Sequence, residues 1–522
     1  MKRIRIFLIL ILAVSLFSCT KLDESFRGEL EQADNSSITA SGLLINAYNS
    51  IGGSFQGNGN IWSTTNITTD EAIAPTRGPD WYDNGLWQAL HAHTWNPDHE
   101  FVAGAFTEML VAQFNASNVL QYNPTAQQAA EARFLRALSM YWVLDGYDQV
   151  PYREDLTDYK ILPITLKGLE AADFIISELN DIIADLPDTG PAYTANKNAA
   201  RALLMKIYLN KGVYANRAAP TFDPADMNKV ISLADEIINS NKYTLNDNFF
   251  DIFAPDNDVK SKESIYSFYN SSSDNRGANV RGFAFMVSHY NMNPSGWNGF
   301  ATLSDFYDKF DPTDKRLGGY YPYPAGLPNP GKRTNVGFLI GRQYNLTTDA
   351  PLNARNPSTA PLSFTREVKI NEPDPNTLEF TGIRVMKYPY DYAAPGDQKN
   401  NDYVMFRLAD VLLMKAEAIL RGGTGTAAGP YGSTALEIVN SIRTKRGASA
   451  LASADLNALL DERGREMYWE CWRRNDLIRF GKFLQAWQEK AADNGTTNLL
   501  FPIPSNQLAV NPNLTQNPGY NN

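Results

Sequence analysis

The sequence predicts a mainly α-helical protein in which stacked helical hairpins carry a large, irregular, loop-rich layer with a few short strands. Three observations support this fold class. Apolar residues recur with helical spacing in segments of roughly 15–20 residues that are separated by short Gly/Pro breaks. Further segments of this kind follow residue 402. Between the two groups, residues 241–401 are rich in Gly, Pro, Asn, Asp and aromatic residues and show no apolar periodicity, which favours loops and short strands.

The first group contains six expected helices. They cover residues 38–51, 101–121, 126–146, 170–186, 197–211 and 224–240. Asp223 is expected to cap the last of these helices, because its carboxylate can accept from free backbone N–H groups and Pro224 suits the first helical position. Alternating helices of this length are typical of tetratricopeptide-type hairpins, although the sequence has no clean repeat of about 34 residues.

The second group is expected to begin with one long helix at residues 403–421, where nearly every position is apolar. Its charged residues, Arg407, Asp410, Glu417 and Arg421, would share one stripe of that helix. Further helices are expected at 434–447, 455–472 and 476–491, the first of them with a capping box formed by Thr434 and Glu437. These charges, with Glu462 and Arg465, could be catalytic, but ion pairs between packed helices are the favoured interpretation.

Composition excludes one class of partner. The chain of 522 residues has a net charge of −10 and no basic run beyond its first residues, so a nucleic-acid partner is not expected. Nine Trp and 26 Tyr are present, and many of them lie in Gly-, Asn- and Pro-rich segments where they cannot all be core residues. This distribution is the first indication of a binding function.

The N-terminus resembles a bacterial lipoprotein signal. Lys2, Arg3 and Arg5 precede an apolar run at residues 6–17 that is too short for a stable membrane span, and Cys19 follows Ser18. Residues 1–18 are therefore expected to be the signal peptide and residues 19–36 a polar tether lipidated at Cys19. The alternative is a plain secretory signal with an incidental Cys19. The other cysteine, Cys471, is expected to be buried and inert, so no disulfide is expected.

Two aromatic segments are candidates for the binding site. The irregular insert at residues 60–100 and the segment around residues 290–300 combine aromatic rings with amides, carboxylates and a guanidinium group. Aromatic rings can stack on the apolar face of a pyranose, while polar groups bond its hydroxyls, so this composition suits sugar binding. The candidate ligand-binding residues are Asp70, Arg77, Trp81, Tyr82, Asn84, Trp87, Trp95, Tyr290, Asn293 and Trp297. The alternative for each ring is that it packs the irregular layer onto the helices.

Enzymatic function is not expected. The sequence has no phosphate-binding loop, nucleophile elbow or zinc-protease motif. His91, His93, Asp98 and His99 could bind a metal, but this His-x-His arrangement is a weak signal and no metal or cofactor is expected. Asp70 and Glu71 are adjacent and would point in opposite directions in extended chain, so they cannot act as a glycosidase pair, although a distant carboxylate pair stays open.

Several motifs together resemble the SusD/RagB family of Bacteroidetes outer-membrane lipoproteins. Besides the N-terminal signal, the resemblance is carried by EARFLRALSMYWVLDGYDQVP (131–151), FRLADVLLMKAEAIL (406–420), VNSIRTKRG (439–447), ERGREMYWECWRRNDLIRFG (462–481) and the closing run at 500–520. One departure is Asp148, where the family usually has Gly before Val-Pro, and it is expected to affect a turn.

The resemblance implies a SusD-like scaffold with helical parts at 37–240 and 402–522 and a ligand-binding layer at 241–401. It also implies a non-catalytic protein at the cell surface that captures oligosaccharide and delivers it to a SusC-like TonB-dependent transporter. Trp81 and Trp297 are the residues carried over as ligand contacts. The alternatives are a peptide-binding member of the family, a surface glycosidase, and a structural lid without ligand contacts of its own.

Overall fold

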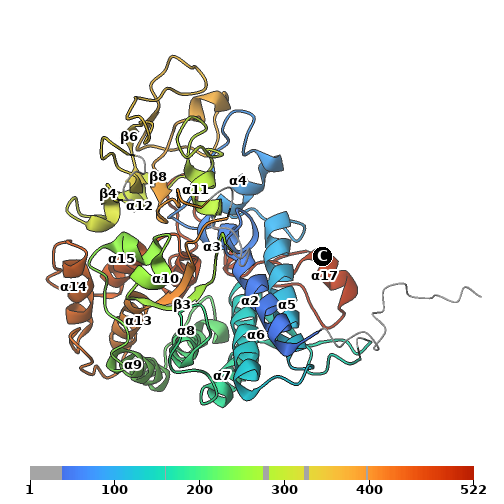
Figure 1. Cartoon of the computed structure of the whole chain (residues 1–522). Coiled ribbons are helices and arrows are strands. Elements are labelled where there is room, and N and C mark those ends of the chain that lie inside the picture. Colours follow the sequence, from blue (N-terminus) through green and yellow to red (C-terminus); the bar gives the residue numbers. More distant parts are fainter. Residues whose placement is uncertain (1–37, 159, 274–280, 323–328, 395–397, 522) are drawn as a thin grey trace, which may run out of the picture. The chain divides into compact units, whose positions relative to one another are not determined.

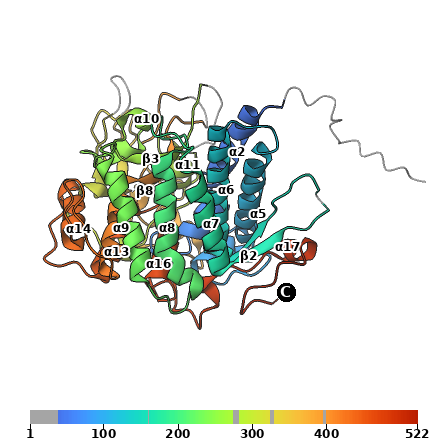
Figure 2. The same cartoon turned by 90° about the horizontal axis from the view of Figure 1, so that it is seen from below.

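Helical hairpins form the scaffold of residues Ala40–Asn522, which make one structural unit. The computed structural model describes residues 38–158, 160–273, 281–322, 329–394 and 398–521. In Figure 2 the helices from α5 to α9 lie side by side, with α13 and α14 beyond α9. The main helices are α2 (Ala40–Ser54), α5 (Glu100–Val119), α6 (Ala126–Tyr147), α7 (Gly168–Ile182), α8 (Lys197–Ala215), α9 (Pro224–Asn239), α13 (Leu408–Leu420), α14 (Ala435–Lys445) and α15 (Leu456–Met467).

Local sequence accounts for several helix ends. Asp223 accepts from the backbone N–H of Ala225 at the start of α9, and Thr434 with Glu437 forms a capping box at α14, as predicted. Gly422 follows the last turn of α13 with a φ of +102°, a conformation that costs glycine little. Asp148 caps α6 with a φ of +66°, so the departure from the family pattern does lie in a turn.

The irregular layer is a long insertion between two neighbouring helices. Helix α13 packs against α9, although about 170 residues separate them in sequence. The ends of the insertion are joined by antiparallel pairing of β3 (Ser264–Phe268) with β9 (Tyr403–Arg407). Figure 1 shows the inserted segments above the helices, around β4, β6 and β8.

The inserted strands and helices are short. The insertion contains η3 (Phe249–Phe253), α10 (Asn257–Lys260), α11 (Arg281–Val287), α12 (Ser304–Tyr307), η4 (Lys315–Leu317), β4 (Gly318–Gly319), β5 (Val336–Leu339), β6 (Gly341–Arg342), β7 (Ser363–Phe364), η5 (Pro375–Leu378) and β8 (Arg384–Met386). Strands β4, β5 and β8 form one three-stranded sheet, and β6 pairs with β7. Elsewhere β1 (Gln149–Tyr152) pairs with β2 (Ile164–Lys167).

A second irregular segment lies between α2 and α5. It contains α3 (Asn60–Asn66), η2 (Asp83–Gly85) and α4 (Leu86–His91). Trp62 of α3 stacks on Phe300 of the long insertion at 4.6 Å between ring centres and meets Trp469 edge-on at 5.3 Å. One hydrophobic core therefore joins this segment, the insertion and the C-terminal helices.

Three helix predictions near the C-terminus were wrong. Residues 403–407 form strand β9 rather than the first turn of a helix, because they are buried on both faces and pair with β3. The expected helix at 455–472 ends at Met467, and Trp469 and Cys471 follow with positive φ. The expected helix at 476–491 is instead α16 (Arg473–Arg479), and Gly481 follows shortly after its end with a φ of +65°. The chain then continues through η6 (Thr497–Leu499) and α17 (Ser505–Val510).

The expected signal peptide at 1–18 and the whole of the expected tether at 19–36, including Cys19, lie outside the described residues. Within the described part of the chain, no helix combines the length and apolar character needed to cross a membrane.

Candidate ligand-binding site

The charged residues of the C-terminal helices form a buried ion-pair network, as the sequence favoured. Glu466 accepts from Arg407 at 2.7 Å, Arg446 at 2.8 Å and Arg316 at 2.9 Å. Arg479 pairs with Glu417 at 2.7 Å in a second group of buried charges. Each of these side chains is committed to other protein groups, so they fasten helices together and are not candidates for ligand contact.

Trp81 and Trp297, the two residues carried over from the family resemblance, lie together in the structure. The indole Nε1 of Trp81 donates to the backbone oxygen of Trp297 at 2.7 Å. Trp81 is 8% exposed, and its ring packs against Trp87 and Phe300, whereas Trp297 is 42% exposed. The burial of Trp81 favours a supporting role for its ring, and Trp297 is the more exposed of the two.

The segment that carries Trp297 is held mainly through its backbone. Arg77 is buried and donates to the backbone oxygen of Gly299 at 3.0 Å, as well as to the oxygens of Leu378 and Thr381. A Cβ at Gly299 would lie 2.3 Å from the Trp81 ring, so only glycine allows this close packing. Arg77 therefore anchors the segment from beneath and has no donor directed at a surface ligand.

A polar cluster lies beside these tryptophans. The Tyr290 hydroxyl donates to Asp80 Oδ2 at 2.6 Å, and Arg355 pairs with the same oxygen at 3.1 Å. The guanidinium of Arg355 also lies 3.7 Å from the centre of the Tyr290 ring. Burial, followed by the hydrogen bond to Asp80, raises the pKa of Tyr290, so the hydroxyl stays protonated at neutral pH. Asp80 and Arg355 are half-exposed partners that the sequence analysis did not single out.

Three further candidates border the same region. Tyr82 is 55% exposed and directly follows Trp81. Asn84 is also exposed, in the η2 turn. Asn293 is exposed on the Trp297 segment and donates to Thr347 Oγ1 at 2.5 Å. We refer to Tyr82, Asn84, Tyr290, Asn293 and Trp297 as the Trp297 platform.

The remaining predicted site residues have structural partners elsewhere. Asp70 forms a two-point ion pair with Arg473 at 2.6 and 2.7 Å. Trp87 is buried and donates to Asp83 at 2.6 Å. Trp95 is buried against Phe501 and donates to the Tyr520 hydroxyl at 2.7 Å. Their ring faces and charges are occupied within the protein, which favours packing roles for all three.

The histidines bind protein groups. His91 lies within hydrogen-bond distance of the backbone oxygens of Ile67 and Gln488, and burial lowers its pKa to about 4. His93 lies between Asp493 and the Thr68 oxygen, at 3.0 and 2.9 Å. His99 contacts the Leu86 oxygen at 3.0 Å. Among the described residues, no group of three or more His, Cys, Asp or Glu side chains is placed to hold a metal ion.

Comparison with known proteins agrees with this architecture. The model of the SusD family matches residues 252–520, which is just over half of the chain. The chain belongs to the SusD family. It is similar to the starch-binding protein SusD of Bacteroides thetaiotaomicron, with 26% identity over 90% of this chain and 87% of the relative. It is also similar to a SusD-like protein of Formosa agariphila, with 24% identity over 88% of this chain and 82% of the relative.

Solved structures show the same fold. A SusD superfamily protein from Parabacteroides distasonis aligns with a TM-score of 0.69 at 20% identity, over 92% of this chain and 98% of the other. Surface glycan-binding protein A from Bacteroides thetaiotaomicron, solved with laminarihexaose, aligns with a TM-score of 0.67 at 17% identity, also over 92% of this chain and 98% of the other. The predicted SusD-like, mainly α-helical fold is confirmed. The starch-binding protein SusD and surface glycan-binding protein A are named as binding proteins and not as enzymes, in agreement with the prediction of a non-catalytic protein.

Proposed function

We propose that this SusD-family protein is a surface lipoprotein that captures oligosaccharide and delivers it to a SusC-like TonB-dependent transporter. The observation that carries the proposal is the Trp297 platform. It presents two exposed aromatic rings, Trp297 and Tyr82, on an irregular segment whose backbone is anchored by buried groups. Binding sites are often found on loops that a rigid scaffold holds in place.

The chemistry of the platform suits a neutral sugar chain. Indole and phenol rings offer flat faces to the C–H side of a pyranose, and the half-exposed groups around them offer hydrogen bonds to its hydroxyls. Asn84 and Asn293 each have an amide that can donate and accept, while Asp80 accepts and Arg355 donates. Two stacking contacts give modest affinity, which is compatible with later release to a transporter.

The relatives support the ligand class. One of them is named a starch-binding protein, and another is named a surface glycan-binding protein and was solved with laminarihexaose. The proposed lipidation of Cys19 would hold the protein at the outer membrane, and Asp23 and Glu24 resemble the acidic signal that directs such lipoproteins to the outer face.

Calorimetry of a soluble form that starts after Cys19 tests the binding proposal. We expect binding of maltoheptaose or laminarihexaose, or of another chain in a panel of neutral oligosaccharides. Trp297→Ala and Tyr82→Ala should each weaken it about fivefold or more, because loss of a stacking contact costs about 1 kcal/mol or more. Phe114→Ala is the matched control, since Phe114 is an aromatic residue of α5 that is 54% exposed.

Three results would contradict this assignment. Wild-type affinity in both platform variants would exclude the Trp297 platform as the site. Binding of a peptide pool instead of any oligosaccharide would make the protein a peptide-binding member of the family. Product formation on prolonged incubation with the bound oligosaccharide would identify a glycosidase.

A further inference from the structure

A pocket that is separate from the Trp297 platform lies in another part of the insertion. It has a volume of about 380 Å³ and is lined by residues from segments 255–271, 321–322, 390–393 and 400–402. This volume is within the range of small-molecule sites in proteins. None of its lining residues belongs to the Trp297 platform or to the neighbouring polar cluster of Asp80, Tyr290 and Arg355. The two regions can therefore be altered independently.

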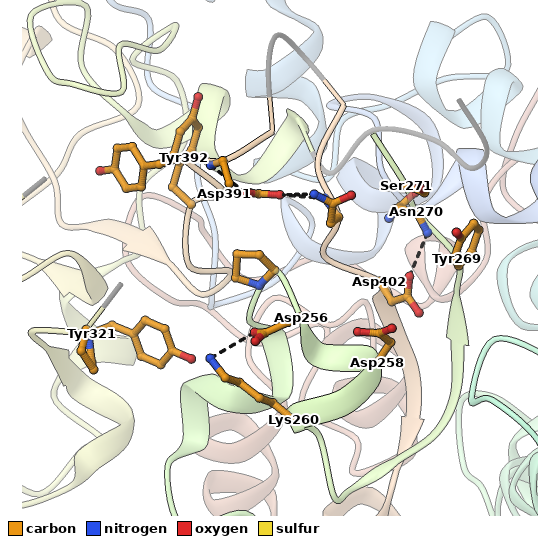
Figure 3. A pocket seen from close by; sticks show the side chains of 15 residues that line it. Asp256, Asp258, Lys260, Tyr269, Asn270, Ser271, Tyr321, Asp391, Tyr392 and Asp402 are labelled. Atoms are coloured by element: carbon orange, nitrogen blue, oxygen red, sulfur yellow. Dashed lines mark hydrogen bonds and ion pairs between the residues drawn. The ribbon is translucent and has the colours of Figure 1, made fainter. Parts of the chain in front are cut away.

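Four tyrosines line this pocket: Tyr269, Tyr321, Tyr390 and Tyr392. Figure 3 shows Tyr321 and Tyr269 on opposite sides of it, with Tyr392 above. Their positions are fixed by other protein groups. The Tyr321 hydroxyl donates to Asp251 at 2.7 Å, the rings of Tyr390 and Tyr392 meet edge-on at 4.7 Å, and Tyr269 packs on Tyr193 at 4.6 Å. The walls of the pocket are therefore aromatic, and contacts within the protein hold them in place.

Most charges in the pocket already have partners. Asp256 pairs with Lys260 at 3.1 Å. Both carboxylate oxygens of Asp391 accept from N–H groups of its own loop, including the side chain of Asn400 at 2.7 Å. Lys260 is therefore a resident cation of the pocket and offsets part of its negative charge. Lys399 does not line the pocket but lies against Tyr390, 4.3 Å from the centre of its ring.

Two carboxyl groups stay available to a ligand. Asp258 is exposed and has no hydrogen bond or ion pair with any residue in the described ranges. Asp402 accepts from the backbone N–H of Asn270 at 2.8 Å and from Ser267 at 3.2 Å. Burial raises the pKa of Asp402 to about 7, so near neutral pH this group can donate to a hydroxyl as well as accept from one.

Asn270 adds an unused acceptor at the same wall. Its Nδ2 donates to Gln56 and to the backbone oxygen of Asn401, at 2.6 and 2.8 Å. Its Oδ1 is buried and has no hydrogen-bond partner among the described residues. Buried acceptors are normally satisfied, so a ligand hydroxyl or a water carried with it would complete this site.

We propose that this tyrosine pocket is a second carbohydrate-binding site, which takes a neutral sugar residue between Tyr269, Tyr321 and Tyr392 with its hydroxyls on Asp258 and Asp402. A neutral ligand fits better than an amine, because Lys260 already pairs with Asp256 and both oxygens of Asp391 already accept from N–H groups. The class of ligand rests on the proposed function, whereas the position of the site does not.

A neighbouring hollow suggests that more than one sugar residue is bound. Tyr269 also lines a second cavity of about 420 Å³ along α2, together with Tyr193, Gln127 and Gln128. Tyr269 thus separates the two cavities. An oligosaccharide that extends from the tyrosine pocket past Tyr269 would contact further aromatic rings and amides in the second cavity. We expect longer oligosaccharides to bind the pocket more tightly than a monosaccharide.

The test uses a soluble form that lacks the platform rings, Trp297→Ala with Tyr82→Ala. This variant is screened against immobilised neutral oligosaccharides, including maltoheptaose, laminarihexaose, cellohexaose, xylohexaose and mannohexaose, and the best ligand is titrated by calorimetry. We expect residual binding with a stoichiometry of about one. Adding Asp258→Asn and Tyr392→Ala should weaken it at least tenfold, whereas Tyr392→Phe, which keeps the ring, should retain it.

Tyr320→Ala is the matched control, because Tyr320 is 41% exposed beside Tyr321 but does not line the pocket. Thermal melting of each variant separates lost binding from lost folding. The pocket proposal is overturned if the platform variant binds no member of the panel, or if Asp258→Asn with Tyr392→Ala leaves its binding unchanged. Full wild-type binding by the platform variant that disappears with the pocket substitutions would support the pocket while contradicting the Trp297 platform.

Discussion

Trp81 and Trp297 come from segments of the same aromatic and irregular composition, but their indole rings lie in opposite environments. The sequence could identify both segments as unusual, because aromatic residues between prolines and glycines rarely all belong to a core. It could not separate the supporting ring from the exposed one. That difference depends on contacts between distant parts of the chain. Phe300 and Gly299, which lie more than 200 positions after Trp81 in the sequence, pack against its ring. Arg77 binds the backbone of the segment that carries Trp297.

This distinction at the residue level gives a stability prediction. Trp81→Ala should lower the free energy of unfolding by about 3–5 kcal/mol, because it removes a buried ring and the hydrogen bond to the Trp297 oxygen. Trp297→Ala should change it by less than about 1 kcal/mol, since the side chain is partly exposed and the hydrogen bond from Trp81 goes to the backbone oxygen, which the substitution keeps. Urea denaturation followed by tryptophan fluorescence or circular dichroism measures both. Equal losses in the two variants would contradict the supporting role of Trp81.

Among the elements, those with strong local signals were predicted well. The helices at α5, α6, α8 and α9 and the caps at Asp223 and Thr434 follow from apolar periodicity and from side chains that satisfy free N–H groups. Strand β9 was missed because an apolar run buried on both faces has no period that separates strand from helix. Its partner β3 lies more than 130 residues earlier, and this pairing decides the conformation.

A second stability prediction concerns Glu466 of α15, which lies at the centre of the buried ion-pair network. Burial alone would raise the pKa of Glu466, but the guanidinium groups of Arg446, Arg407 and Arg316 hold it well below its ordinary value of 4.5. Glu466→Gln should therefore lower the free energy of unfolding by about 3–5 kcal/mol at pH 7, because it leaves three buried cations short of a counter-charge. Glu437→Gln, in the exposed capping box of α14, is the control and should cost less than about 1 kcal/mol.

The stability difference between wild type and Glu466→Gln should depend on pH, and the direction of the pKa shift of Glu466 determines how. A depressed pKa gives stability that is complete above pH 4.5, where the unfolded chain is also ionised, and that is lost as the pH falls further. The gap between wild type and Glu466→Gln should shrink below pH 4.5, since a protonated glutamate resembles glutamine. Denaturant midpoints between pH 7 and pH 3 measure this. A gap that stays constant over that range would contradict a charged Glu466.

At the scale of the whole molecule, the large insertion between α9 and α13 explains why an irregular region separates two groups of helices in the sequence. In the sequence, a change in composition near residue 241 and a return of helical periodicity near 402 are the signals that lie closest to its ends. What the sequence could not show is that α13 packs on α9, which makes the layer an insertion into a continuous helical array. The position of the tyrosine pocket depends on the same arrangement, because segments at both ends of the insertion build it.

The proposed anchor and partner are tested on the full chain in its native membrane. Cys19→Ser should release the protein from the outer membrane, because the thiol that would carry the lipid is removed while the polar tether is kept. Cell fractionation and surface labelling measure this, and Cys471→Ser is the control. We also expect affinity purification of the wild-type protein to recover a TonB-dependent barrel protein. Retention of Cys19→Ser in the membrane fraction, or purification without any such barrel, would contradict the corresponding part of the proposal.

The anchoring of the Trp297 segment has a consequence for how ligand preference can evolve. Trp81 and Arg77 bind the backbone oxygens at positions 297 and 299, and these oxygens are present whatever side chain position 297 carries. Substitutions at 297 therefore leave the fastening of the segment in place while changing what it presents outward. A library at Tyr82, Asn293 and Trp297 on this fixed framework should contain many folded variants, so a lineage could move to a new glycan by few mutations without first acquiring a stabilising change.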